Sequence, residues 1–168
     1  MTAMTTPSAD PAAAASERVR AALEALGFEP RMLIHDASTH TAEEAAAAAA
    51  CELGQIVKTL VVYVAAEPMF VLVAGDRRLD DRLLAGRFGV GRKRVKLASA
   101  EQVLELTGYP VGGVSPFGTP RPLPAVIDDS FQRFEVLWLA GGAANAIFPM
   151  PLSVVVRLTH GEIAAVST

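Results

Sequence analysis

The sequence predicts a single α+β domain, and three observations support this fold class. Helix-like and strand-like segments are intermixed along the chain. The two most apolar strand-like segments are separated by only a few residues, which favours antiparallel pairing in a hairpin. The 168 residues correspond to about one domain. With 51% hydrophobic and 20% charged residues, the composition also excludes wholesale disorder.

The N-terminal segment predicts a tail followed by a helix. Residues 1–15 are rich in Ala, Pro, Thr and Ser, and they are expected to form a flexible tail ahead of a folded domain over residues 16–168. Ser16 is suited to cap a helix, and apolar residues recur at helical spacing after it. Gly27 is suited to end this helix.

A short strand and a second helix are expected next. Residues 31–35 form an apolar run of strand length. Thr41 and Glu44 then have the spacing of a capping box, and the alanine run after them favours a helix that continues to Gly54.

The strongest strand signal is the nearly continuous β-branched run over residues 55–64, which predicts a strand buried on both faces. Glu67 and Pro68 are expected to turn the chain, so that residues 69–74 pair back on this strand. The remaining elements are expected as follows: helices over 80–88, 99–108 and 151–159, a loop over 112–124, and strands over 93–97, 124–128, 134–140, 146–148 and 161–166. Ser99 and Gln102 have the spacing of a second capping box, and Gly108 is suited to end the helix that follows.

The composition bears on where the protein works. No apolar run approaches the ~20 residues that a membrane helix needs. The N-terminal residues lack the basic and bulky apolar regions of a secretory signal. The single cysteine, Cys51, fits a reducing compartment. We therefore expect a cytoplasmic protein.

Positive charge is concentrated in one segment. Between Arg77 and Lys96 there are eight basic and two acidic residues, a charge of +6 on a chain whose net charge is −3. Such a segment could be a landing site for a polyanion, and a solvated helix face is the simpler alternative.

Lys58 is the most informative single residue. It lies inside the apolar run IVKTLVV, where a lysine must reach solvent, pair with an acid or face a cavity. In a cavity its ammonium would stabilise negative charge strongly. An edge-strand lysine pointing into water is the alternative.

Glycine-rich segments offer a second kind of site. Gly112–Gly118 contains closely spaced glycines whose backbone N–H groups could bind a carbonyl or an oxyanion. Its members are Gly112, Gly113, Val114, Ser115, Pro116, Phe117 and Gly118. Gly141 and Gly142, which follow a strand, could likewise approach a ligand closely, and a tight turn is the alternative.

Three further side chains could line the same pocket. Asp76 and Asp128 each follow a strand, and either could bind a substrate ammonium, pair with Lys58 or cap a helical turn. His35 ends the first strand, where a hydrogen-bonded structural histidine is the simpler interpretation. The histidines and Cys51 lack the spacing of zinc ligands, so no metal or cofactor is expected.

Together these segments resemble the YbaK/EbsC-type aminoacyl-tRNA deacylases, which are free-standing relatives of the editing domain of bacterial prolyl-tRNA synthetase. The resemblance runs from about Val19 to Ser167. It is carried by QIVKTLVV, GDRRLD, TGYPVGGVSPFG, VID and AGG, in this order and at these spacings.

The resemblance implies a compact domain with a curved, mixed or antiparallel, barrel-like sheet surrounded by helices. It implies hydrolysis of the ester between a wrong amino acid and the 3′-terminal adenosine of a tRNA. Lys58 matches the essential lysine of the family, and Gly112–Gly118 matches the loop that shapes the amino-acid pocket.

The resemblance also names partners. The acceptor end of an aminoacyl-tRNA would meet the basic segment, and Arg92, Lys93, Arg94 and Lys96 are the expected phosphate contacts. Prolyl-tRNA synthetase is a further possible partner. Cysteine, alanine and serine on the proline tRNA are the candidate substrates. A non-catalytic module that binds an aminoacyl end, a nucleotide or a partner protein, and a hydrolase of another small ester or amide, are the alternatives.

Overall fold

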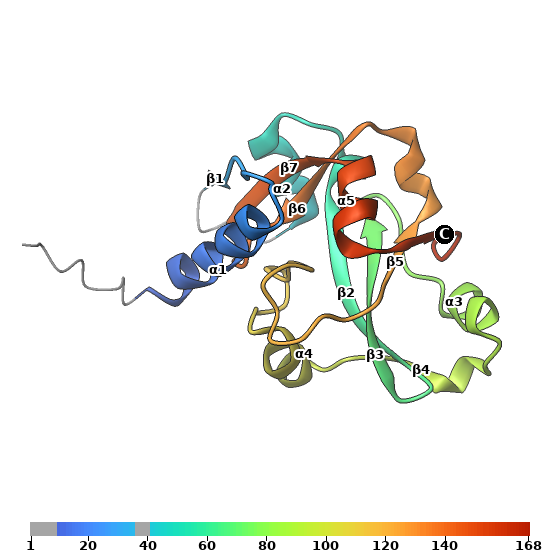
Figure 1. The fold of residues 1–168 in the computed structure, drawn as a ribbon. Coiled ribbons are helices and arrows are strands. Elements are labelled where there is room, and N and C mark those ends of the chain that lie inside the picture. The colour runs from blue at the N-terminus through green and yellow to red at the C-terminus, as the bar shows by residue number, and fades with distance from the viewer. Residues whose placement is uncertain (1–9, 36–40) are drawn as a thin grey trace, which may run out of the picture.

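The computed structural model describes residues 10–35 and 41–168, and in this part of the chain five α-helices and eight strands form an α+β domain (Figure 1). The helices are α1 (Pro11–Ala25), α2 (Ala42–Ala49), α3 (Asp81–Phe88), α4 (Ala100–Thr107) and α5 (Leu152–Thr159). The strands are β1 (Leu33–Ile34), β2 (Val57–Val64), β3 (Glu67–Ala74), β4 (Val95–Leu97), β5 (Ala125–Asp128), β6 (Val136–Ala140), β7 (Ala146–Pro151) and β8 (Glu162–Ala164). The predicted fold class is confirmed.

The strands form two separate sheets. The larger sheet has the order β4-β2-β3-β5-β8 and is mixed, because β5 pairs in parallel with both β3 and β8. The smaller sheet, β1-β7-β6, is antiparallel. A single bridge between Ile56 and Trp138 connects them. The expectation of a barrel-like sheet was wrong, because pairing does not continue past this bridge and β4 and β8 remain edge strands.

The β2–β3 hairpin is in the predicted place, but its turn is not. The register runs from Val57 opposite Ala74 to Val64 opposite Glu67, so Glu67 and Pro68 already belong to β3. The turn is made by Ala65 and Ala66, whose φ angles are 51° and 72°. A two-residue hairpin turn requires this left-handed backbone because its twist matches that of the strands.

The first helix begins earlier than predicted. Asp10 accepts a hydrogen bond from the Ala12 N–H at 3.0 Å, and Pro11 occupies the first helical position. Residues 11–15 therefore belong to the domain rather than to a tail, and Ser16 lies inside the helix; residues 1–9 lie outside the described residues. An Asp-Pro start followed by alanines is a stronger signal than Ser16.

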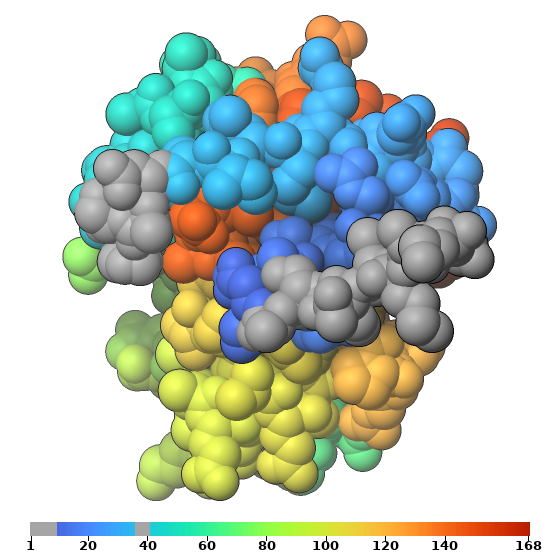
Figure 2. All heavy atoms as spheres, turned by 90° about the vertical axis from the view of Figure 1, so that its left-hand side faces the viewer, coloured from blue at the N-terminus to red at the C-terminus, as the bar shows by residue number. Residues whose placement is uncertain are grey.

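The other helix boundaries mostly follow their caps. Thr41 caps α2 as expected, but the helix ends at Ala50, which adopts a left-handed backbone, rather than at Gly54. The capping box of Ser99 and Gln102 opens α4 and Gly108 ends it, as predicted. Figure 2 shows the N-terminal third of the chain (blue to cyan) above the α4 segment (yellow) on one face of the molecule.

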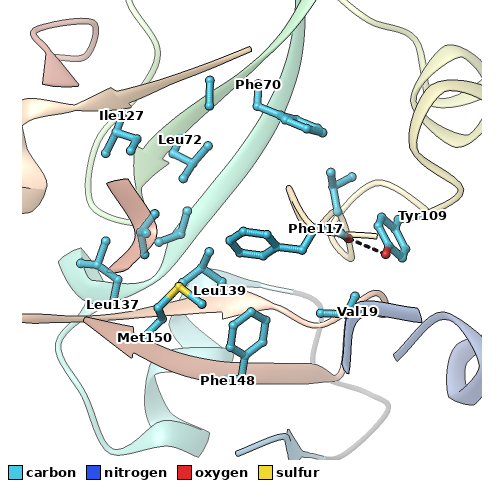
Figure 3. Packing of buried hydrophobic residues seen from close by; sticks show 14 of the residues in the cluster. Val19, Phe70, Leu72, Tyr109, Phe117, Ile127, Leu137, Leu139, Phe148 and Met150 are labelled. Atoms are coloured by element: carbon cyan, nitrogen blue, oxygen red, sulfur yellow. Dashed lines mark hydrogen bonds between the residues drawn. The ribbon is translucent and has the colours of Figure 1, made fainter. Parts of the chain in front are cut away.

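The main core fills the space between the two sheets and α1. Figure 3 shows Phe70 and Leu72 of the larger sheet facing Leu139 and Phe148 of the smaller one, with Phe117 between them. All five of these side chains are buried. This core fixes the position of β2 relative to β6, and the candidate site lies at the margin where these two strands meet.

Candidate functional site

A small pocket lies along the open edge of β2. Strand β4 pairs with β2 only at Val62–Val64, so the first half of β2 has no ladder partner on that side, and β6 meets it only at the Ile56–Trp138 bridge. The start of α2, strand β6 and residues 111–114 enclose a cavity of about 250 Å³ beside this edge. Its polar side chains are Thr41, Lys58 and Thr59, and its apolar wall includes Ala45, Ile56, Val114, Trp138, Ala140 and Ile147.

Lys58 lies between this apolar pocket and a second, polar hollow. The second hollow measures about 620 Å³ and is also lined by Glu43, Asp76, Arg77 and Arg78. The Lys58 ammonium donates a hydrogen bond to the Arg77 carbonyl oxygen at 2.5 Å. Burial lowers the pKa of Lys58, and the positive charge of Arg78 lowers it further, while Asp76 and Glu43 act in the opposite direction. The predicted cavity lysine is therefore a half-buried cation at a pocket.

Only part of the glycine loop reaches the pocket. Gly112 and Val114 line it together with Val111. The Gly113 N–H already bonds the Pro110 carbonyl oxygen at 2.9 Å, whereas in the described part of the chain the N–H groups of Gly112 and Val114 make no hydrogen bond. These two amides are the loop donors that a ligand carbonyl could use.

The rest of the loop packs into the core, which is why it needs glycine. A Cβ on Gly113 would lie 2.8 Å from the Ala143 Cα atom, and one on Gly118 would lie 2.5 Å from the Tyr109 hydroxyl oxygen. The same hydroxyl donates to the Phe117 carbonyl oxygen at 2.6 Å (Figure 3).

Ser115 and Pro116 complete this part of the loop. The Ser115 hydroxyl accepts from the Phe117 N–H at 3.2 Å, and Pro116 is half-buried. Neither residue lines the pocket. The structure does not bring the loop's Gly113, Ser115, Pro116, Phe117 and Gly118 to the ligand space.

Asp76 borders the polar hollow but has its own partner. Its carboxylate forms a two-pronged ion pair with Arg133, at 2.8 and 2.9 Å. Hydrogen bonding to that guanidinium holds the pKa of Asp76 below its ordinary value. Asp76 is thus close to Lys58 without being its hydrogen-bond partner.

Asp128 has a structural environment rather than a pocket position. It is 1% exposed and accepts from the Val166 N–H at 2.9 Å and the Ser167 hydroxyl at 2.7 Å, as well as from the Ser130 hydroxyl. It also caps the short 3₁₀ turn Asp129–Arg133, one of the alternatives weighed from the sequence. Burial acts to raise the pKa of Asp128, but the donated hydrogen bonds outweigh it and the pKa is lowered.

Gly141, Gly142 and His35 lie away from the pocket wall. A Cβ on Gly141 would lie 2.4 Å from the Met32 sulfur, and one on Gly142, at φ 94°, would lie 2.8 Å from the Ala15 backbone. These glycines let the segment after β6 pack against the N-terminal region. His35 extends the pairing of β1 with β7, where its N–H donates to the Asn145 carbonyl oxygen at 2.9 Å.

The predicted phosphate contacts lie at the opposite end of β2. Arg92, Lys93 and Arg94 form an exposed 3₁₀ turn, and Lys96 on β4 is exposed opposite Tyr63. At ~3.3 Å per strand residue, the five steps along the strand from Lys58 to Tyr63 span about 17 Å. Arg92 is paired with Asp81 at 2.9 Å. The structure therefore separates these cations from Lys58.

Several pocket residues were missed in the sequence. Strand β6 alternates between buried Leu137 and Leu139 and half-exposed Trp138 and Ala140, and the second pair lines the pocket. This alternation was visible in FEVLWLA, and the only tryptophan of the chain marks the pocket face. The Arg77 carbonyl carries no side-chain signal, so a sequence cannot indicate it.

The described residues contain neither a candidate metal-binding cluster nor a candidate membrane-spanning helix. No three His, Cys, Asp or Glu side chains among them come close enough together to bind a metal ion. None of their helices combines the length and the apolar character that a membrane crossing requires.

Comparison with known proteins places the chain in a family. The family model of the aminoacyl-tRNA editing domain matches residues 36–158, and the chain belongs to this family. This confirms the resemblance found in the sequence. The model spans Lys58, the glycine loop and the basic segment.

Individual relatives agree with this assignment. The chain is 40% identical over 102 residues to a proline–tRNA ligase of Maridesulfovibrio salexigens, covering 61% of this chain and 17% of the ligase. It thus spans about a sixth of that relative. It is 31% identical to the uncharacterised protein YwhH of Bacillus subtilis, covering 66% of this chain and 69% of YwhH. A crystal structure described as a candidate trans-editing enzyme for prolyl tRNA synthetase superimposes with a TM-score of 0.86 at 37% identity, covering 92% of this chain and 97% of that chain.

Proposed function

We propose that this chain is a trans-editing deacylase that hydrolyses the ester between a small non-cognate amino acid and the 3′ end of a tRNA. The proline tRNA carrying Cys, Ala or Ser is the proposed substrate. Family membership supports the reaction class, and the ligase and the trans-editing relatives support the proline tRNA. The observation that carries the proposal is Lys58, a half-buried cation at the mouth of a small apolar pocket.

The pocket suits an aminoacyl group. Its apolar wall and its volume of about 250 Å³ leave room for a small side chain, with Trp138 and Ala45 among the residues that would limit larger ones. A substrate seated there would present its ester to Lys58 and to the loop amides. A ligand bound at the open edge of β2 would also lie beside backbone groups that the strand holds in fixed positions.

Hydrolysis then needs little covalent chemistry from the protein. An aminoacyl ester is already activated, so positioning and stabilisation of the developing oxyanion can supply the rate. In this proposal Lys58 holds the ester or the terminal ribose, and the N–H groups of Gly112 and Val114 polarise the carbonyl. A water molecule attacks the carbonyl carbon, the ester C–O bond breaks, and the products are the free amino acid and the tRNA with its terminal hydroxyl restored.

The test is release of amino acid from a panel of mischarged tRNAs. Cysteinyl-, alanyl- and seryl-tRNA of the proline type are incubated with the wild-type protein, with Lys58→Met and with Arg121→Ala. Methionine keeps most of the lysine stem and removes the charge. Arg121, an exposed cation outside the pocket, is the matched control. We expect release by the wild type and by Arg121→Ala but not by Lys58→Met.

Other outcomes would contradict the proposal. Turnover retained in Lys58→Met would remove the lysine from the mechanism. Binding of tRNA by a folded protein without release from any substrate would favour the non-catalytic binding module. Release from small esters but not from charged tRNA would favour a hydrolase of another class.

A further inference from the structure

We propose that Ser167 and Asp128 are positioning residues for Lys58, acting through Arg77. They hold the backbone segment whose carbonyl orients the Lys58 ammonium. This inference deepens the proposed function and rests on it for the role of Lys58. It adds two residues to the site: Asp128, which lies inside the matched family region of residues 36–158, and Ser167, which lies beyond it.

The chain of contacts begins at the Lys58 ammonium. Lys58 Nζ donates to the Arg77 carbonyl oxygen at 2.5 Å. Within the described part of the chain, no carboxylate lies within ion-pair distance of this ammonium. The neighbouring Asp76 is paired with Arg133 instead. A lysine side chain has four flexible bonds, so its direction depends on the acceptor that holds it. The acceptor here is a main-chain atom, and its position depends on whatever fixes residues 76–78.

The C-terminal residues fix this segment through the backbone. The Arg78 N–H donates to the Thr168 carbonyl oxygen and the Thr168 N–H returns a bond to the Arg78 carbonyl oxygen, both at 2.9 Å. The Asp80 N–H donates to the Val166 carbonyl oxygen at 2.8 Å. Leu79 and Ser167 form the antiparallel bridge between the two segments.

The side chain of Arg77 adds a second attachment on the same residue. Its Nε donates to the Ser167 hydroxyl at 2.6 Å, and its Nη2 donates to the Ser167 carbonyl oxygen at 3.0 Å. The Arg77 carbonyl oxygen accepts the hydrogen bond of Lys58, and the Arg77 side chain is bound to Ser167. A displacement of Ser167 would therefore move the oxygen atom that orients the Lys58 ammonium.

Asp128 completes the arrangement. The Ser167 hydroxyl accepts from Arg77 and donates its proton to the Asp128 carboxylate at 2.7 Å. The carboxylate also receives the Val166 N–H at 2.9 Å and lies 3.9 Å from Arg77 Nε. Asp128 and Ser167 are both buried, so these contacts are shielded from water. One hydroxyl therefore joins the buried carboxylate to the residue that orients Lys58.

A matched pair of variants tests this role. Ser167→Ala removes the hydroxyl between Asp128 and Arg77. Ser130→Ala removes a different hydroxyl from the same carboxylate, and that hydroxyl does not touch Arg77. Since each variant removes one hydroxyl that bonds Asp128, we expect each to lower the unfolding midpoint by about 2–4 °C.

The two variants should differ in catalysis. For Ser167→Ala we expect kcat to fall about 10- to 100-fold with KM within about threefold, because misplacement of a reacting group costs rate rather than binding. For Ser130→Ala we expect kcat to stay at the wild-type value. Equal losses in both variants, or no loss in Ser167→Ala, would overturn the proposal.

A measurement without substrate separates this inference from the proposed function. The chain has three lysines, so the ε-methylene groups of ¹³C-lysine-labelled protein give three NMR signals, and Lys58→Met identifies the one from Lys58. We expect the Lys58 signal to move toward those of exposed Lys93 and Lys96 in Ser167→Ala but not in Ser130→Ala. An unmoved signal would overturn the positioning role. A moved signal in a protein that releases no amino acid would support it and contradict the deacylase proposal alone.

Discussion

The two ends of strand β2 carry the same kind of charge in opposite settings. At its beginning, Lys58 is half-buried beside a pocket, and burial lowers its pKa. At its end, β4 pairs with β2 and presents Lys96 and the turn Arg92–Arg94 to solvent. In Figure 1 these ends lie near α2 and β6 at the top and near β4 at the bottom.

The difference separates two tasks that a protein acting on a charged tRNA has to perform. A cation shielded from water interacts strongly with one nearby group, whereas exposed cations attract phosphates weakly and are screened by salt over ~8 Å. We therefore expect chemistry to depend on the first end and tRNA affinity on the second. Variants at each end of the strand test this division.

The first prediction concerns the buried end. Lys58→Met should lower kcat by about 10³-fold or more, since the side chain is the one cation that this pocket holds among the described residues. The Kd for uncharged tRNA should change less than about threefold. Single-turnover deacylation and filter binding measure the two quantities. A parallel loss of binding would show that the two ends are not separate in function.

The second prediction sharpens the role of the pocket. Ala45→Leu places a larger side chain in the pocket wall, and it should lower kcat/KM for the preferred aminoacyl-tRNA by about 10- to 100-fold, as expected when a fitted pocket loses volume. Ala47→Leu on the exposed face of the same helix is the control and should have no effect. Equal kinetics for both variants would place the amino acid elsewhere.

The third prediction concerns the exposed end. Neutralising Arg92, Lys93 and Arg94 together should weaken tRNA binding and reduce the slope of log Kd against log salt by up to about 2–3, or ~0.7–0.9 for each lost phosphate contact. The value of kcat at saturating tRNA should be unchanged. Binding isotherms at several salt concentrations measure the slope. An unchanged slope would remove this turn from the tRNA-binding surface.

Sequence reasoning succeeded where local chemistry decides the structure. The Ser99 capping box, the strand around Lys58 and the end of α4 at Gly108 all depend on neighbouring residues, and they were predicted correctly. The expectation that this strand is buried on both faces was wrong, because Lys58, Thr59 and Leu60 are only half-buried where they line the pocket. It failed where the deciding contact comes from far along the chain. Nothing near Asp128 in the sequence indicates that Ser167 will hold it.

The glycines illustrate the same limit. A run such as Gly112–Gly118 shows that the backbone must come close to something, but not to what. In the structure Gly112 faces the pocket, while Gly113 faces the Ala143 backbone. Likewise, the apolar strands predicted a sheet, but the number of sheets depends on long-range pairing, which ends at the Ile56–Trp138 bridge.

The smallest expected effect compares one carboxylate from each end of the strand. At the Lys58 end, Asp128 is buried and its pKa is lowered by donated hydrogen bonds that outweigh burial. At the other end, Asp81 forms an exposed pair with Arg92. A lowered pKa means that the folded state prefers the ionised carboxylate. The stabilisation that the ionised Asp128 carboxylate provides is therefore complete above the unfolded-state pKa of about 3.9. It is lost as the pH falls toward the pKa of the folded state.

Asp128→Asn should accordingly destabilise the protein by about 1–3 kcal/mol at pH 7, and its deficit relative to the wild type should shrink below about pH 4. Asp81→Asn should change stability by less than about 1 kcal/mol, as an exposed ion pair contributes little. Urea unfolding between pH 2.5 and pH 7 measures both. If the difference in the free energy of unfolding between Asp128→Asn and the wild type stays constant through this pH range, the ionised carboxylate is not what holds the C-terminal segment beside Lys58.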